Sequence, residues 1–274
     1  MLSAEEWWGI LEAYGAKVWP AQAVFFLAAV LLVLLVFLKP GRIANTLTRL
    51  YMALSFGWAG IVFFLALGKG LKGNYFFGSL FIIVAILFAV DLFRQKMNFY
   101  LPRSSWQRHV TLLLTLIVLC YPIFSIAFGH YFPRVIIPGT FPCPTTALAL
   151  VLLTTALPRV DKIIYIILLF WAIPFPPFIQ IPKYGVYEDT IMFAIGIYSL
   201  VMLVKNWKEK PAPNQGIQPT SQRPRLIPGV IQEKRKNMER ISLSFRIRNI
   251  FEGFTEVSGI ICLEGDSIEI EFQT

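Results

Sequence analysis

The sequence predicts an all-α membrane protein with about seven transmembrane helices and a small β-rich C-terminal tail. Of its 274 residues, 56% are hydrophobic and only 15% are charged, and the mean hydropathy is +0.63. Soluble domains carry about 25% charged residues, so this chain has too few polar groups to cover a surface that faces water. Its apolar residues also form continuous runs rather than alternating, which predicts membrane-spanning helices rather than strands.

Seven apolar runs are candidate transmembrane helices, because about 20 residues are needed to cross the hydrocarbon core and about 17 to 25 are tolerated. These runs are residues 21–38, 50–67, 75–93, 110–128, 144–157, 161–178 and 189–205. Three prolines between positions 138 and 144 crowd the start of the fifth run, and three more between 174 and 177 interrupt the sixth. We therefore expect the fifth and sixth helices to be broken or irregular at one end.

The first 20 residues predict an N-terminal helix that lies in the membrane interface. Trp7, Leu11, Tyr14 and Val18 have helical spacing, and their aromatic rings would sit at the depth of the lipid headgroups. A ligand-binding aromatic cage is the alternative. Acidic residues stand where a signal peptide would be basic, so we expect no cleavable signal and a first apolar run that stays as a span.

Beyond the transmembrane domain of residues 21–210, the composition changes twice. Residues 211–229 hold five prolines among polar residues, which predicts an extended linker. Residues 230–274 show period-two alternation at 243–247, 257–263 and 267–273, with Glu264-Gly265-Asp266 as a turn between the last two strands. We expect a small cytoplasmic β-rich tail, an incomplete or appended element rather than a catalytic domain.

The distribution of positive charge predicts the orientation. Residues 1–210 carry 17 Lys and Arg against 8 Asp and Glu, whereas residues 211–274 carry 8 of each, so the net charge of +9 belongs to the helical part. Five of these cations fall on the side of the N-terminus and twelve on the other side. The positive-inside rule then places the N-terminus outside and the C-terminus in the cytoplasm, which requires an odd number of spans. Cations that flank helices do not indicate a nucleic-acid partner.

The run of residues 129–146 is the most unusual part of the chain. It holds four prolines, two glycines, one of the two histidines and one of the three cysteines. Proline blocks helix formation, so part of this run is non-helical, while Pro144 suits the first turn of a helix whose free amides bind polar groups. Broken helices of this kind form substrate sites in many transporters. The candidate solute-binding residues are therefore His130, Arg134, Cys143, Thr145 and Thr146.

Other chemistry for this run has less support. Cys143 and His130 are the only thiol and imidazole expected outside, too few for a metal site. A nucleophilic Cys143–His130 pair would need a contact that the spacing permits but does not require. The structural alternative is that the prolines shape a turn and Cys143 packs. Nucleotide-binding, zinc-protease and hydrolase motifs are absent from the sequence, so we assign no cofactor, no metal and no catalytic residue.

Three further acidic residues stand out. Asp91 is the candidate intramembrane polar residue, and we expect it to pair with Arg94 on the same helix face near the cytoplasmic boundary, a proton relay being the alternative. Glu188 and Asp189 open the last apolar run from the outside. With His130 and Arg134 they could line an external vestibule.

Short motifs give the chain a family resemblance. Trp7-Trp8, the run Val18-Trp19-Pro20-Ala21-Gln22 and the run from Phe141 to Thr146 resemble an uncharacterised bacterial family of multi-pass membrane proteins, the domain of unknown function 6064. The resemblance covers about residues 5–205 and leaves out the tail. It implies the bacterial inner membrane, and it brings no activity, substrate or catalytic residue.

These observations lead to one functional hypothesis and two alternatives. We expect a non-enzymatic integral membrane protein that binds or transports a small solute through broken helices five and six. The first alternative is a structural or assembly partner of another membrane protein or a homo-oligomer, with Gly57, Gly60, Gly78 and Gly196 offering small-residue surfaces. The second is an intramembrane enzyme that uses Cys143 and His130.

Overall fold

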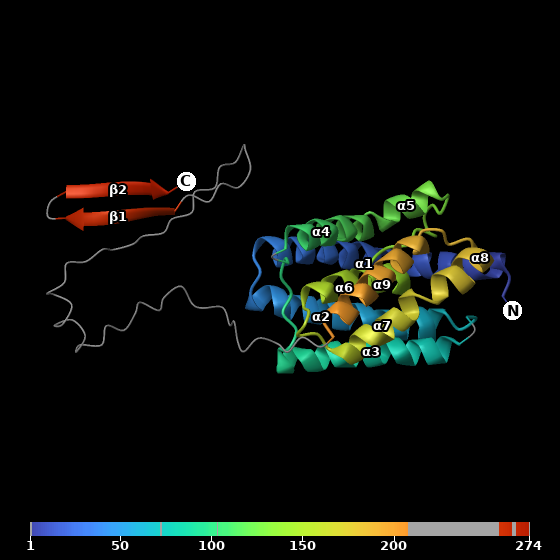
Figure 1. Cartoon of the computed structure of the whole chain (residues 1–274). Helices are drawn as coiled ribbons and strands as arrows, with labels where there is room; N and C mark the ends of the chain where they lie inside the picture. The colour runs from blue at the N-terminus through green and yellow to red at the C-terminus, as the bar shows by residue number, and fades with distance from the viewer. Residues whose placement is uncertain (1, 72, 103, 208–257, 265–266, 274) are drawn as a thin grey trace. The chain divides into compact units, whose positions relative to one another are not determined.

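The structure is a computed structural model, and it describes residues 2–71, 73–102, 104–207, 258–264 and 267–273. The chain divides into two compact units, Met1–Asn214 and Gln215–Thr274. All described elements of the first unit are helical, and those of the second are two strands (Figure 1). An all-helical first unit with several apolar helices is what the composition predicts.

Helix α1 (Ala4–Leu38) is a single helix that includes both the predicted N-terminal helix and the first apolar run. Ser3 and Glu6 form a capping box at its start, and Pro20 lies inside it without ending it. At 1.5 Å per residue its 35 residues extend about 52 Å, which exceeds the hydrocarbon core of about 30 Å. The aromatic N-terminal part is therefore a rigid extension of the first apolar helix rather than a separate element.

The next helices form three further long elements and one bent pair. Helix α2 (Arg42–Trp58) continues into the π-helix η1 (Ala59–Leu67), and α3 (Asn74–Arg94) packs against both. Helices α4 (Ser105–Leu119) and α5 (Tyr121–Ala127) meet at a bend of 53°. Helix α7 (Lys162–Ala172) is followed by the π-helix η2 (Pro176–Gln180) and the short α8 (Ile181–Tyr184).

Helix α6 (Pro142–Thr155) is the central element of this unit (Figure 1). It packs against α2, α4, α7 and α9 (Asp189–Lys205), and every one of its residues except Cys143 is buried. Apolar side chains that face outwards on the surrounding helices are exposed instead: Leu31, Ile86 and Leu113 are each more than half exposed. The outer surface of this unit is thus apolar, which suits an apolar surrounding.

Four helical segments among the described residues are long and apolar enough to cross a membrane, or five if the bent pair α4–α5 is one span. The four are Ala4–Leu38, Arg42–Leu67, Asn74–Arg94 and Lys162–Tyr184. Two of the seven expected spans are shorter than this: α6 has 14 residues and α9 has 17. The sixth run is irregular as expected, because its prolines change the hydrogen-bonding pattern to that of a π-helix.

In the second unit, strands β1 (Ser258–Glu264) and β2 (Ser267–Gln273) pair antiparallel, from Ser258 opposite Gln273 to Glu264 opposite Ser267. The predicted strand at 243–247, the linker of residues 211–229 and the turn residues Gly265 and Asp266 lie outside the described residues. A folded β-rich tail therefore remains a prediction.

Candidate functional site

The segment of residues 128–141, which connects α5 to α6, folds back between α1 and the start of α6. Tyr14 of α1 donates a hydrogen bond to the Thr140 carbonyl over 2.8 Å and accepts one from Trp58 Nε1 over 2.8 Å. Gly15 allows the backbone of this segment to approach α1 closely, since a Cβ atom at Gly15 would lie 1.9 Å from the Pro133 carbonyl oxygen. This segment is therefore packed against the rigid N-terminal part of α1.

Two adjacent carboxyl groups are buried where this segment meets the start of α9. Glu188 and Asp189 are both fully inaccessible to solvent. His130 Nδ1 lies 2.8 Å from Glu188 Oε1, and the Ser125 hydroxyl donates to the same oxygen over 3.1 Å. The Tyr121 hydroxyl donates to Asp189 Oδ1. Each carboxyl group thus has its own set of partners.

Cys143, at the start of α6, joins the Asp189 side of this arrangement. Its Sγ accepts a hydrogen bond from Gln180 Nε2 over 3.1 Å, and its thiol also interacts with the Asp189 carboxyl group. Gln180 comes from η2, where the prolines interrupt the regular α-helix. We call these residues the acidic cluster: Tyr121, Ser125, His130, Cys143, Gln180, Glu188 and Asp189.

Several polar atoms of the acidic cluster are buried without a hydrogen-bond partner. They are Glu188 Oε2, Asp189 Oδ2 and Gln180 Oε1, all three of which are acceptors. Among the described residues, His130 is the only basic side chain that forms an ion pair with either carboxyl group. An unpaired buried carboxylate is costly, so this arrangement requires an explanation beyond packing.

Aromatic rings of α1 cover the outer side of the acidic cluster. The ring of Trp8 lies 3.9 Å from that of His130, and Trp8 Nε1 donates to the Tyr184 carbonyl over 2.9 Å. Trp7 stacks on the Tyr184 ring at 4.8 Å. These two tryptophans therefore pack on the protein. Glu188 and Asp189 are fully buried, so in this packing they do not line the external vestibule expected for them.

The remaining predicted site residues do not belong to the acidic cluster. Arg134 pairs with Glu12 through bonds of 2.9 and 2.7 Å, and both side chains are nearly half exposed. The Thr145 hydroxyl accepts from the Gly139 amide over 2.8 Å and donates to the Phe141 carbonyl over 2.6 Å, so it stabilises the turn before α6. The Thr146 hydroxyl is buried and has no partner.

Cys143 and His130 do not form the pair that a thiol nucleophile would need. Each interacts with a different one of the two adjacent carboxyl groups. Within the described residues, no three side chains of His, Cys, Asp or Glu are placed to hold a metal ion together. The sequence alone did not identify Tyr121, Ser125 and Gln180 as site residues, because an isolated polar residue in an apolar helix gives no signal of its partner.

Asp91 pairs with a residue other than the one expected. Its Oδ2 lies 2.8 Å from Arg49 Nε of α2, and both side chains are buried. Its carboxylate also accepts from the backbone amides of Lys96 and Met97. Arg94 is exposed instead, because Asp91 faces α2 in the packing of α2 against α3. The expected surface ion pair is thus a buried one between two helices.

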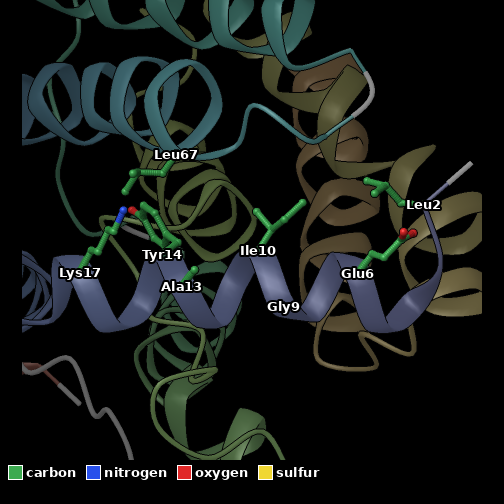
Figure 2. Close-up of a pocket in the computed structure, with 8 residues that line it drawn as sticks. All are labelled: Leu2, Glu6, Gly9, Ile10, Ala13, Tyr14, Lys17 and Leu67. Carbon is green, nitrogen blue, oxygen red and sulfur yellow. The ribbon is translucent and has the colours of Figure 1, made fainter.

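A separate groove of about 360 Å³ runs along the N-terminal part of α1. Figure 2 shows Glu6 and Lys17 towards opposite ends of this groove, with Ile10 and Tyr14 between them and Leu67 facing them from η1. None of the residues that line the groove belongs to the acidic cluster. The groove is therefore separate from the acidic cluster.

The glycines considered for contacts with a partner are used inside the chain. A Cβ atom at Gly60 would lie 2.8 Å from the Gly78 carbonyl oxygen, so these two glycines allow η1 and α3 to pack closely. Gly196 faces Ala172 at 3.1 Å, where α9 meets α7. Association with another chain therefore has no support from these positions and remains a prediction.

Comparison with known proteins gives a family but no relative of known activity. No curated protein and no solved structure matches the chain. One family profile, described as a family of unknown function, DUF6064, matches residues 4–212. This range contains all helices of the first unit and every residue of the acidic cluster. The chain therefore belongs to the DUF6064 family.

Proposed function

We propose that this chain is a multi-pass integral membrane protein that binds and moves a small solute at the acidic cluster. The observation that carries this proposal is the pair of fully buried carboxyl groups, Glu188 and Asp189, with unpartnered oxygens between broken helices. Ionisable residues inside apolar helices are costly and are usually retained for function. Interrupted helices that bring polar groups together are typical of transporters, and here the π-helix η2 contributes Gln180, which bonds to Cys143 of the same cluster.

The proposed topology has seven spans, with the N-terminus outside and the C-terminus inside the bacterial inner membrane. Helix α6 is shorter than a usual span, but it is buried among other helices, and non-helical backbone is tolerated in a membrane where protein surrounds it. The bent pair α4–α5 and the 17-residue α9 supply the other two crossings beyond the four long segments.

Contacts between loops support this sidedness. Segments predicted to be outside meet at one end: Trp8 bonds to Tyr184, and Glu12 bonds to Arg134. Segments predicted to be inside also meet one another: the Asn45 side chain accepts from the Phe99 amide, and Lys162 donates to the Trp207 carbonyl. The contacts of both groups agree with the assignment from the charge count.

The test is thiol labelling of Cys143 in intact cells with a membrane-impermeant maleimide, in a Cys120→Ser, Cys262→Ser background. Cys143 is partly buried in the structure, and a solute pathway must expose it to water during the transport cycle. We expect labelling from the outside. A matched variant that retains only Cys120, which is also partly buried but lies at the α4–α5 bend, should stay unlabelled.

If Cys143 reacts neither in intact cells nor in inverted vesicles, yet reacts after denaturation, the site does not open and the solute proposal is refuted. An assembly role would then be examined by purification in mild detergent. A stoichiometric membrane partner would support that alternative.

A further inference from the structure

We propose that the acidic cluster is a proton-binding site, and that its proton exchanges with water outside through His130. The proposal deepens the proposed function, on which it rests, because it names the proton as the ion that accompanies the solute. It concerns the two carboxyl groups of Glu188 and Asp189 and the imidazole that lies between Glu188 and the surface.

The first argument is charge. Both carboxyl groups are fully buried, and a buried ionised carboxylate is destabilising unless a cation compensates its charge. Glu188 has His130 as a basic partner, whereas Asp189 accepts a hydrogen bond from the neutral hydroxyl group of Tyr121. Two adjacent carboxylates with one imidazole leave a negative charge, which a bound proton removes.

The second argument is space. The groove that the described residues form lies along α1, away from the acidic cluster. In the packed arrangement a proton can bind to a free carboxyl oxygen without any rearrangement, whereas a larger cation needs room. Gln180, which is 7% exposed, donates its Nε2–H to Cys143 of the cluster, and its Oε1 is buried without a partner.

The third argument is access. The His130 side chain is 14% exposed, while Glu188 is not exposed at all. The ring of Trp8 lies against the imidazole, with the two ring centroids 3.9 Å apart. His130 is therefore the group that links Glu188 to water, since an imidazole has two ring nitrogens that can accept and donate a proton.

The proton transfer itself balances without another reactant. A hydronium ion in the water outside donates a proton to a ring nitrogen of His130, which gives the imidazolium form and leaves a water molecule. The Nδ1–H bond of His130 then breaks, its electron pair stays on Nδ1, and a new O–H bond forms at Glu188 Oε1. The products are a neutral imidazole and a neutral carboxylic acid, and the reverse step returns the proton. Tyr121 of α5, Cys143 of α6 and Asp189 of α9 are the other titratable groups of the acidic cluster, and α1 places the uncharged ring of Trp8 against His130.

The test is infrared difference spectroscopy of the full-length protein in lipid nanodiscs as the pH is changed, with the carboxylic C=O band as the signal. For the unmodified protein we expect a band from a buried carboxylic acid whose intensity changes with pH. Glu188→Gln and Asp189→Asn should each remove part of it. Glu12→Gln is the matched control, because Glu12 is exposed and outside the cluster, and it should leave the band unchanged.

A second measurement tests the role of His130. After transfer to D₂O, the buried acid should exchange its proton, and His130→Gln should slow that exchange about tenfold or more, since a positioned imidazole speeds proton transfer by about 100-fold or more in enzymes. A structural role alone would change stability without changing the exchange rate of the folded protein. An unchanged exchange rate would overturn the assignment of His130.

The outcomes separate this inference from the proposed function. A buried acid band that is absent from the unmodified protein at every pH, or is lost in Glu12→Gln, overturns the proton site, and the labelling of Cys143 is unaffected by that result. A band that depends on Glu188 and Asp189 while Cys143 never reacts supports the proton site and refutes solute movement.

Discussion

The buried ion pair between Arg49 and Asp91 allows a quantitative test of the packing of α2 against α3. Arg49 Nε and Asp91 Oδ2 are 2.8 Å apart, and the two side chains are 1% and 5% exposed. Removing one member of a buried pair leaves the other charge uncompensated, which typically costs about 3–5 kcal/mol. We therefore expect Arg49→Met and Asp91→Ala each to lower the free energy of unfolding by about 3–5 kcal/mol.

The double variant Arg49→Met, Asp91→Leu should lose less than the sum of the single changes, because neither charge is then left alone. It should still be destabilised by about 1–3 kcal/mol, since the buried Met97 amide loses its acceptor. The control is Arg94→Met. That side chain is exposed, so its removal should change the stability by no more than about 0.5 kcal/mol.

The measurement is equilibrium unfolding of the purified protein in mixed micelles with increasing sodium dodecyl sulfate, followed by tryptophan fluorescence. The chain contains seven tryptophans, which give a sufficient signal. The reasoning is refuted if Arg94→Met destabilises as much as Arg49→Met, which would make the neighbour on the same helix the true partner. Additive effects in the double variant would equally show that the two side chains are not coupled.

Three further predictions follow from other contacts. Gly15→Ala should destabilise the folded protein measurably in the same unfolding assay, because its Cβ would overlap the Pro133 carbonyl, whereas Gly9→Ala has open space and should be neutral or slightly stabilising. Tyr14→Phe should cost about 1–3 kcal/mol, as it leaves Nε1 of the partly buried Trp58 without its acceptor, and an unchanged stability would show that this bond is not formed. Alkaline phosphatase, an enzyme active only outside the cytoplasm, should be inactive when fused after Lys210, and activity there would contradict the proposed orientation.

The helical class could be predicted because it depends on the hydrophobicity and charge of each run of residues. Long apolar runs and few charges indicate membrane helices whatever their neighbours are, and the interruption of the sixth run follows from the prolines at its end. The number of long helices was harder to predict. Helix α6 is buried among other helices of the protein. Its hydropathy alone therefore does not show that it is short or that it lies at the centre of the unit.

The candidate site could be predicted only in part. The unusual composition of residues 129–146 located His130 and Cys143, which do belong to the acidic cluster. The same reasoning included Arg134, which bonds to Glu12 on the surface, and Thr145, which stabilises its own turn. Proximity in sequence does not distinguish a side chain directed into the core from one directed outwards.

The sequence by itself determined that this chain forms apolar helices, because the preference of each run for a membrane is a local property. It also located the charges that favour one orientation. Only the tertiary structure decided which polar groups meet: Arg49 rather than Arg94 pairs with Asp91, and His130 reaches Glu188 across 58 residues of sequence. The physical reason is that a buried charge selects its partner through the packing of helices, and that packing depends on contacts between residues far apart in the chain.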